Sequence, residues 1–121
     1  MAMPRKTRNV LVVDDSAAAR NVVVHLLRRD PAFRVRGVAH DALEAVSLTG
    51  KDCPDMIVLD HEMPGMSGLE ALPLLREQCP TARIVLWSLG NLEDQALRAG
   101  GDGFVSKAEP IDRLLEWLRA A

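Results

Sequence analysis

Short apolar runs that each end in a polar or charged side chain limit what this chain can fold into. The clearest run is residues 56–59, Met-Ile-Val-Leu, which lies between Cys53-Pro54 and Asp60. A run this short and this apolar is typical of a β-strand buried on both faces, as in a parallel sheet that helices cover. In sheets of that kind, ligands bind beyond the carboxyl ends of the strands. Asp60 occupies such an end and is therefore a candidate ligand-binding residue.

Three further apolar runs also end in side chains that can bind ions or polar groups. These residues are Asp14 and Asp15 after residues 10–13, Ser88 after residues 84–87, and Lys107 after residues 104–106. Because parallel strands end at one edge of their sheet, we expect these four residues to lie together with Asp60.

Helical patterns separate the apolar runs, and a partly alternating stretch adds an edge strand. The expected helices cover residues 16–29, 41–49, 67–78, 92–99 and about 110–118, and the edge strand covers residues 34–39. We expect Ser16 to cap the first helix, Gly50 to close the second and Pro110 to lie in the first turn of the last. Strand and helix alternate five times, which predicts an α/β sandwich of three layers with a five-stranded parallel sheet.

Composition excludes several classes of protein. With 121 residues, the chain suits a single domain with one core, and its hydrophobic content of 48% is typical of a globular protein. The net charge of −2, with mixed signs, gives no electrostatic reason to expect nucleic-acid binding. No apolar run approaches the roughly 18 residues of a membrane span, and nothing resembles a secretory signal. We therefore expect a cytoplasmic protein.

The termini and the cysteines add two expectations. Residues 1–8 contain Arg5, Lys6 and Arg8, and we interpret them as a disordered or extended, solvated tail before a domain at residues 9–121. Cys53 and Cys79 show no metal-binding spacing, so we expect both thiols to be reduced and structural.

The three acids have a common chemical interpretation. Asp14, Asp15 and Asp60 would repel one another at close range, and a cation would offset that repulsion. Ligation by oxygen atoms, with room for water, suits Mg²⁺, and a hard divalent ion favours a phosphoryl group.

The remaining polar residues fit phosphoryl chemistry. A carboxylate can attack phosphorus and form an acyl phosphate, and each oxygen of the transferring group needs a partner. The cation, the ammonium group of Lys107 and the hydroxyl of Ser88 with nearby backbone N–H groups can supply those partners. Considered alone, Asp14 would be a helix cap and Lys107 a solvated side chain. Five such residues at the ends of four strands favour a site.

The sequence resembles the receiver domain of two-component response regulators from Val10 to Leu118. The matching motifs are Val12-Val13-Asp14-Asp15-Ser16, Leu59-Asp60, Met63-Pro64-Gly65-Met66-Ser67-Gly68, Ser88, Asp102-Gly103-Phe104 and Lys107. Together, in this order and at this spacing, they are highly specific. The resemblance implies a flavodoxin-like sheet of order 2-1-3-4-5, with Asp14 and Asp15 beside Asp60.

The resemblance also implies a phosphorylation switch rather than an enzyme that turns over other substrates. Asp60 would be the phosphoacceptor. Asp14, Asp15, Asp60 and the backbone carbonyl of Glu62 would hold Mg²⁺.

The other matched residues imply how the switch operates. Ser88 would hydrogen-bond a phosphoryl oxygen, Lys107 would pair with the phosphoryl group, and Phe104 would swing inward on activation. The phosphodonor would be a sensor histidine kinase or a phosphotransfer protein. The output would reach a downstream protein, a fused output domain or a second copy in a homodimer.

Three features depart from the family pattern. Lys107 is followed by Ala108 rather than by proline, so we expect a trans peptide bond there. Ser88 and Lys107 are 19 positions apart, about three fewer than is usual, so the fourth helix should lose about one turn and its signalling face should be altered or weakened. Leu89 replaces a small residue, and we expect it to narrow access to Asp60.

Several alternatives stay open at this stage. A receiver-like scaffold that works without phosphorylation is one, and a Mg²⁺-dependent phosphatase with Asp60 as nucleophile and Glu62 as second acid is another. A flavin-binding module is weaker, because Asp14 and Asp15 would repel the flavin phosphate. The chain is either a stand-alone regulator or part of a longer one.

The two tryptophans have different expected environments. Trp87 precedes Ser88 in a strand and is expected in the core. Trp117 lies off the buried stripe of the last helix, which leaves open both a partner contact and packing against the sheet.

Overall fold

Five strands and five helices alternate along residues 6–121, the part of the chain that this computed structural model describes. The strands are β1 (Arg8–Val13), β2 (Phe33–Ala39), β3 (Met56–Leu59), β4 (Arg83–Ser88) and β5 (Gly103–Ser106). The helices are α1 (Ala17–Arg28), α2 (Ala42–Lys51), α3 (Gly68–Gln78), α4 (Glu93–Arg98) and α5 (Asp112–Ala120). All strands run parallel in the order β2-β1-β3-β4-β5. The predicted fold class and strand order are confirmed.

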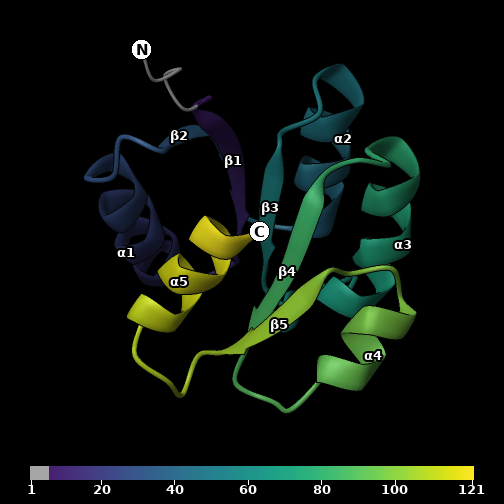
Figure 1. The fold of residues 1–121 in the computed structure, drawn as a ribbon. Helices are drawn as coiled ribbons and strands as arrows, with labels where there is room; N and C mark the ends of the chain where they lie inside the picture. The colour runs from purple at the N-terminus through teal and green to yellow at the C-terminus, as the bar shows by residue number, and fades with distance from the viewer. Residues whose placement is uncertain (1–5) are drawn as a thin grey trace.

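Helices cover both faces of the sheet, with α1 and α5 on one side and α2, α3 and α4 on the other (Figure 1). Successive strand residues point to opposite faces. In β1, Val10 and Val12 therefore join the core beneath α1 and α5, whereas Leu11 and Val13 join the core beneath α2 and α3. This two-sided burial explains why the central strands have apolar runs without a polar face.

Local capping signals start the two helices that follow the acidic residues. The Ser16 hydroxyl accepts a hydrogen bond from the Ala19 N–H at the start of α1. Ser67 and Glu70 form a reciprocal capping box at the start of α3. These caps satisfy backbone donors close to the carboxyl edge of the sheet.

Several local expectations differ from the structure. Gly50 does not close α2, which continues to Lys51. Pro110 lies just before α5, in a turn where its carbonyl accepts from the Arg113 N–H at 3.0 Å. Val22 of α1 is 51% exposed, because this helix fully buries only Val23 and Leu27.

Arg8 belongs to the sheet and not to a tail. It opens β1, and its guanidinium group donates to the backbone carbonyls of Leu118, at 2.8 Å, and Ala121. The same group lies 5.3 Å from the ring centroid of Phe33. The predicted tail is therefore wrong for Arg8, and residues 1–5 lie outside the described part of the chain.

Cys53 and Cys79 form a disulfide, so the expectation of reduced thiols is wrong for this structure. Their Cα atoms are 5.6 Å apart, although the residues are 26 positions apart in the chain. The reason is three-dimensional: α2 and α3 pack together, and the two cysteines follow their carboxyl ends. The sequence spacing alone gave no sign of this proximity.

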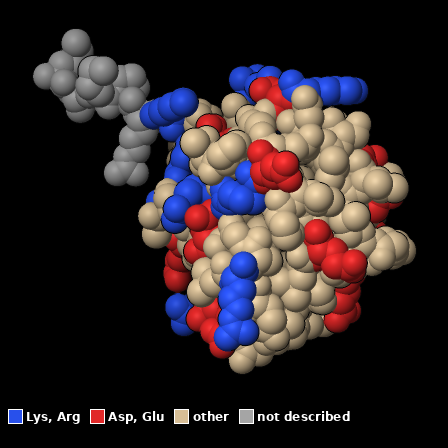
Figure 2. Space-filling model, turned by 90° about the vertical axis from the view of Figure 1, so that its right-hand side faces the viewer, with Lys and Arg blue, Asp and Glu red and all other residues tan. Residues whose placement is uncertain are grey.

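The surface over α2, α3 and α4 carries charges of both signs, scattered among wide areas of uncharged residues (Figure 2). Within residues 6–121, none of the helices has the length and apolarity that crossing a membrane requires. The peptide bond after Lys107 is trans, as expected, since the described residues contain no cis peptide.

A candidate acidic site at the carboxyl edge of the sheet

All five polar residues that follow the predicted strands line one cleft of about 270 Å³. The lining consists of Asp14, Asp15, Ser16, Asp60, Glu62, Ser88, Leu89 and Lys107. The sequence prediction that these strand ends meet is therefore confirmed as geometry.

The register of the sheet sets the positions of the acids. Val13 pairs with Leu59, so Asp14 and Asp60 follow directly on neighbouring strand ends. The Asp60 backbone N–H donates to the Val13 carbonyl at 2.9 Å, which continues the β1–β3 ladder by one hydrogen bond. The two side chains thus leave the sheet side by side.

Asp14, Asp15 and Asp60 can present carboxylate oxygens within 4.8 Å of one another. Asp14 is 1% exposed and Asp60 is 3% exposed, whereas Asp15 is open to solvent. Three carboxylates at this separation, two of them buried, repel one another unless cations share the site. The donor set consists of oxygen atoms alone, as hard divalent cations prefer.

Lys107 supplies one positive charge to this cluster. Its Nζ lies 2.7 Å from Asp14 Oδ2 and 3.1 Å from Asp60 Oδ1. Its backbone N–H donates to the Ser88 carbonyl at 2.9 Å. The Lys107 side chain therefore bridges the two buried acids, and its backbone is hydrogen-bonded to the end of β4.

The pKa values of these groups follow from burial and from their mutual charges. Burial raises the pKa of Asp60 from 3.8 to about 6, the Asp14 carboxylate adds to the rise, and Lys107 opposes it. Burial alone would lower the pKa of Lys107, but its hydrogen bond to Asp14 and the nearby negative charges raise it overall. At neutral pH, Asp60 is thus ionised although burial and the Asp14 carboxylate disfavour its charge, and Lys107 is charged.

Three residues contribute to the cleft in ways that the sequence interpretation missed. The Ser16 N–H donates to Asp14 Oδ1 at 2.9 Å, and Arg20 donates to the Asp14 carbonyl at 2.7 Å. The ring of Trp87 lies under Lys107, 4.8 Å from Nζ. Arg20 could have been noted from its place on the first turns of the helix after Asp14, but the Trp87 contact has no local signal.

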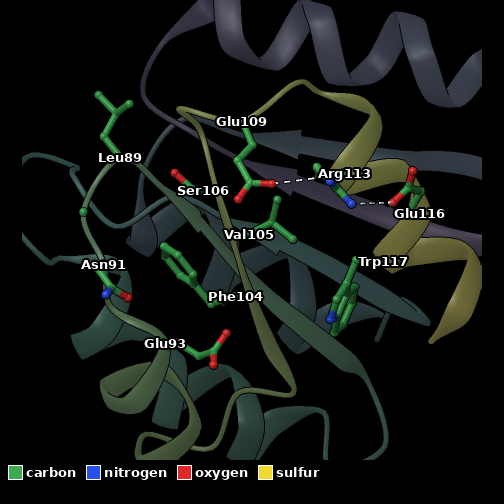
Figure 3. A pocket seen from close by; sticks show the side chains of 11 residues that line it. Leu89, Asn91, Glu93, Phe104, Val105, Ser106, Glu109, Arg113, Glu116 and Trp117 are labelled. Atoms are coloured by element: carbon green, nitrogen blue, oxygen red, sulfur yellow. Dashed lines mark hydrogen bonds and ion pairs between the residues drawn. The ribbon is translucent and has the colours of Figure 1, made fainter.

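Beside the acidic cleft, a larger groove of about 610 Å³ opens between the β4–α4 loop, β5 and α5 (Figure 3). Phe104 is half-buried at this groove, and Trp117 stands at its far side. Trp117 packs against the backbone of Gly103, where an added Cβ would lie 2.3 Å from its Nε1. Trp117 thus combines packing on the sheet with a place in the groove.

The fourth helix is short, as the spacing predicted. Helix α4 has six residues, and Leu92 at its start provides no side-chain cap. Leu89 is 64% exposed and contributes to both the acidic cleft and the larger groove.

The fold and this strand-end cluster can be compared with known proteins. Residues 10–119 match the family described as "Response regulator receiver domain". The chain belongs to this family. The nitrate/nitrite response regulator protein NarL of Escherichia coli K12 is 37% identical over 115 residues, covering 93% of this chain and 53% of NarL.

Two solved structures extend the comparison. The response regulator domain of Thermotoga maritima CheB has a TM-score of 0.88 and 35% sequence identity, with 96% of each chain covered. The chain in a CheX-CheY-BeF3-Mg²⁺ complex from Borrelia burgdorferi has a TM-score of 0.82 and 28% identity, covering 93% of this chain and 87% of that one. The receiver chain spans about half the length of NarL, 53%. By its match to the family model, the chain is a response-regulator receiver domain.

Proposed function

We propose that Asp60 accepts a phosphoryl group from a phosphohistidine on a sensor histidine kinase or a phosphotransfer protein. The observation that carries this proposal is the convergence of Asp60, Lys107, Ser88 and two further acids in one cleft of a receiver domain. Asp60 is buried but faces the cleft, so a donor can reach it from one side only.

The proposed transfer needs a nucleophile and partners for the phosphoryl oxygens. A carboxylate oxygen of Asp60 attacks phosphorus, and the bond from phosphorus to the donor imidazole nitrogen breaks. The electron pair of that bond returns to the imidazole, which takes up a proton, and an acyl phosphate forms on Asp60. Lys107 and the Ser88 hydroxyl, which line the same cleft, would contact phosphoryl oxygens.

We propose Mg²⁺ as the cation of the acidic cluster. The side chains of Asp14, Asp15 and Asp60, with the backbone carbonyl of Glu62, would hold it. Oxygen donors, two buried carboxylates and an open side for water suit this ion. The similar Borrelia chain was solved in a complex containing Mg²⁺. When bound, the ion would neutralise charge on the phosphoryl oxygens.

We propose that Ser88 and Phe104 convert the added charge into a conformational change. Ser88 would move toward the phosphoryl group, and Phe104, half-buried at the groove, would follow inward. We also propose that the domain acts in the cytoplasm. Its output would pass to a protein partner, a fused output domain or a second copy, and the domain itself would neither bind nucleic acid nor catalyse another reaction.

Intact-mass spectrometry with a small phosphodonor tests this function. We expect one added phosphoryl group on the wild-type protein with MgCl₂, and none with EDTA or in Asp60→Asn. Asp112→Asn, at an exposed acid outside the cleft, is the matched control and should accept one phosphoryl group like the wild type. No adduct at any donor concentration would reject the proposal in favour of a phosphorylation-independent scaffold.

A further inference from the structure

Trp87 gives the Lys107 ammonium group a third contact, in addition to Asp14 and Asp60. The Lys107 Nζ lies 4.8 Å from the ring centroid of Trp87. Trp87 is 7% exposed, so the ring meets the cation with little water around it. A cation–π contact that is shielded from water is stronger than one at the surface.

The sheet explains why these two side chains meet. Trp87 pairs with Val105 across β4 and β5. Lys107 follows Val105 by two residues and therefore lies on the same face, as a diagonal neighbour of Trp87. The hydrogen bond from the Lys107 N–H to the Ser88 carbonyl then fixes the base of the lysine beside the ring.

The two carboxylates that Lys107 contacts are also the buried oxygen donors of the proposed cation site. An ammonium group and a divalent cation would compete for the same oxygens of Asp14 and Asp60. The indole ring takes no part in that competition, because hard divalent cations bind oxygen. When a cation occupies the oxygens of Asp14 and Asp60, Lys107 can therefore still keep its contact with Trp87.

We propose that Trp87 is a positioning residue whose indole face holds the Lys107 ammonium group at the cleft while Asp14 and Asp60 bind a cation. Lys107 then remains available to pair with a phosphoryl oxygen on Asp60. Without the ring, its flexible four-carbon stem would allow the ammonium group to turn to solvent. The expected effect of Trp87 on the phosphorylation rate rests on the proposed function, whereas the contact between Trp87 and Lys107 does not.

A double-mutant cycle on phosphorylation rate tests the role. With a small phosphodonor and saturating MgCl₂, we expect Trp87→Leu to slow phosphorylation of Asp60 by roughly three- to thirtyfold, the value of a shielded cation–π contact. Trp87→Phe, which keeps an aromatic face, should fall between Trp87→Leu and wild type. In a Lys107→Met background, Trp87→Leu should change the slow residual rate by less than about twofold. Equal slowing in both backgrounds would show that Trp87 acts only through packing and would overturn the proposal.

Fluorescence tests the contact without any phosphorylation. The chain has two tryptophans and no tyrosine, so Trp117→Phe leaves Trp87 as the one reporter. In this background, we expect the Trp87 emission to differ between Lys107 and the Lys107→Met variant, both in EDTA and in MgCl₂ at concentrations where calorimetry shows binding. Identical emission from the Lys107 and Lys107→Met proteins in EDTA would show that the contact is absent. Emission that becomes identical only in MgCl₂ would show that the ammonium group leaves the ring when the cation binds.

The two proposals fail in distinguishable ways. Absence of any phosphoryl adduct on wild-type protein would reject the proposed function, while the comparison in EDTA would still decide whether the contact exists. Absence of Mg²⁺ binding in calorimetry would reject the cation site and, with it, this role of Trp87. Normal phosphorylation of wild type with no coupling between Trp87 and Lys107 would reject the positioning role alone.

Discussion

Asp60 is a carboxyl group that burial makes hard to ionise, and this has a cost for the folded state. Its pKa rises from 3.8 to about 6, chiefly because it is buried. Between about pH 4 and pH 6, the folded state therefore binds more protons than the unfolded state, and stability falls as the pH rises through this window. The difference corresponds to about 3 kcal/mol at neutral pH.

Asp60→Asn should remove this cost. We expect the free energy of unfolding in EDTA at about pH 7.5 to rise by about 1 to 3 kcal/mol, less than the full amount because Lys107 loses one partner. Below about pH 4 the gain should disappear, since Asp60 is then protonated in both states. Urea denaturation at the two pH values measures this, with the exposed Asp112→Asn as control. A variant no more stable than wild type at the higher pH would contradict the raised pKa.

Leu89 borders the cleft next to Ser88, and its side chain is exposed and does not pack into the core. We expect Leu89→Ala to speed both phosphorylation by a small donor and hydrolysis of the acyl phosphate, by roughly twofold or more. Leu97→Ala, exposed on α4 away from the cleft, should leave both rates unchanged. Rates of Leu89→Ala that match wild type would show that Leu89 does not limit access.

The site residues differ in how far the sequence could predict them. Asp60, Ser88 and Lys107 end short apolar runs, and because parallel strands end at one edge of the sheet, their meeting follows from a one-dimensional pattern. Trp87 lies inside such a run and looks like any core aromatic residue. Its contact with Lys107 depends on the pairing of β4 with β5, and no spacing in the chain expresses that pairing.

At the level of elements, α3 begins so close to β3 that its first residue must be glycine. A Cβ at Gly68 would lie 2.2 Å from the Asp60 carbonyl oxygen and 2.8 Å from the His61 Cα. Alanine is the better helix former, but this clash outweighs its propensity. We expect Gly68→Ala to lower the free energy of unfolding by about 2 to 3 kcal/mol and to slow phosphorylation, because the backbone of Asp60 must move.

Gly90→Ala is the matched control for this prediction. An added Cβ at Gly90 would meet its nearest neighbour, Leu92 Cγ, at an ordinary 3.6 Å. We expect urea denaturation to show a change within about 0.5 kcal/mol for this variant. Similar stabilities for the two alanine variants would mean that the loop after β3 can relax away from α3.

The disulfide joins the ends of α2 and α3 and closes a loop that contains β3 and Asp60. Closing a loop with a separation of 26 residues stabilises a domain by about 3 kcal/mol, largely by restricting the unfolded chain. We expect reduction with dithiothreitol to lower the melting temperature by roughly 10 °C. The exposed Cys53→Ser should melt like the reduced wild type, with or without dithiothreitol. A wild-type melting temperature that is the same with and without dithiothreitol would contradict the cross-link.

The elements also show where sequence patterns stop being informative. Apolar periodicity and caps located the ten elements, because each signal is local. The end of α2 was misplaced at Gly50 because a glycine cap requires a positive φ, and among the described glycines only Gly65 and Gly100 have one. The cysteine pairing was missed for a related reason, since it depends on how α2 packs against α3.

Across the whole molecule, the acidic cleft and the larger groove adjoin at Leu89, which lines both. Ser88 at the end of β4 and Lys107 after β5 line the cleft, whereas residues 104–106 of β5 line the groove (Figure 3). The adjoining helix α4 has six residues and no side-chain cap, so little local structure opposes its movement. We therefore expect charge added at Asp60 to change the conformation of β4, α4 and β5 first.

Hydrogen–deuterium exchange before and after phosphorylation can locate this response. We expect exchange to change in residues 88–99 and 103–111, which contain the proposed switch residues and the short α4, and to stay nearly constant in α1 and α2. The reason is that the lining of the cleft includes no residue of α1 or α2, whereas it includes Ser88 at the end of β4 and Lys107 just after β5, whose side chains would move toward the phosphoryl oxygens. Asp60→Asn exposed to the same donor controls for effects of the reagent. Changes spread evenly over all helices would indicate a global shift in stability rather than a switch along these strands, and unchanged exchange at 88–99 would mean that the short α4 no longer transmits the signal.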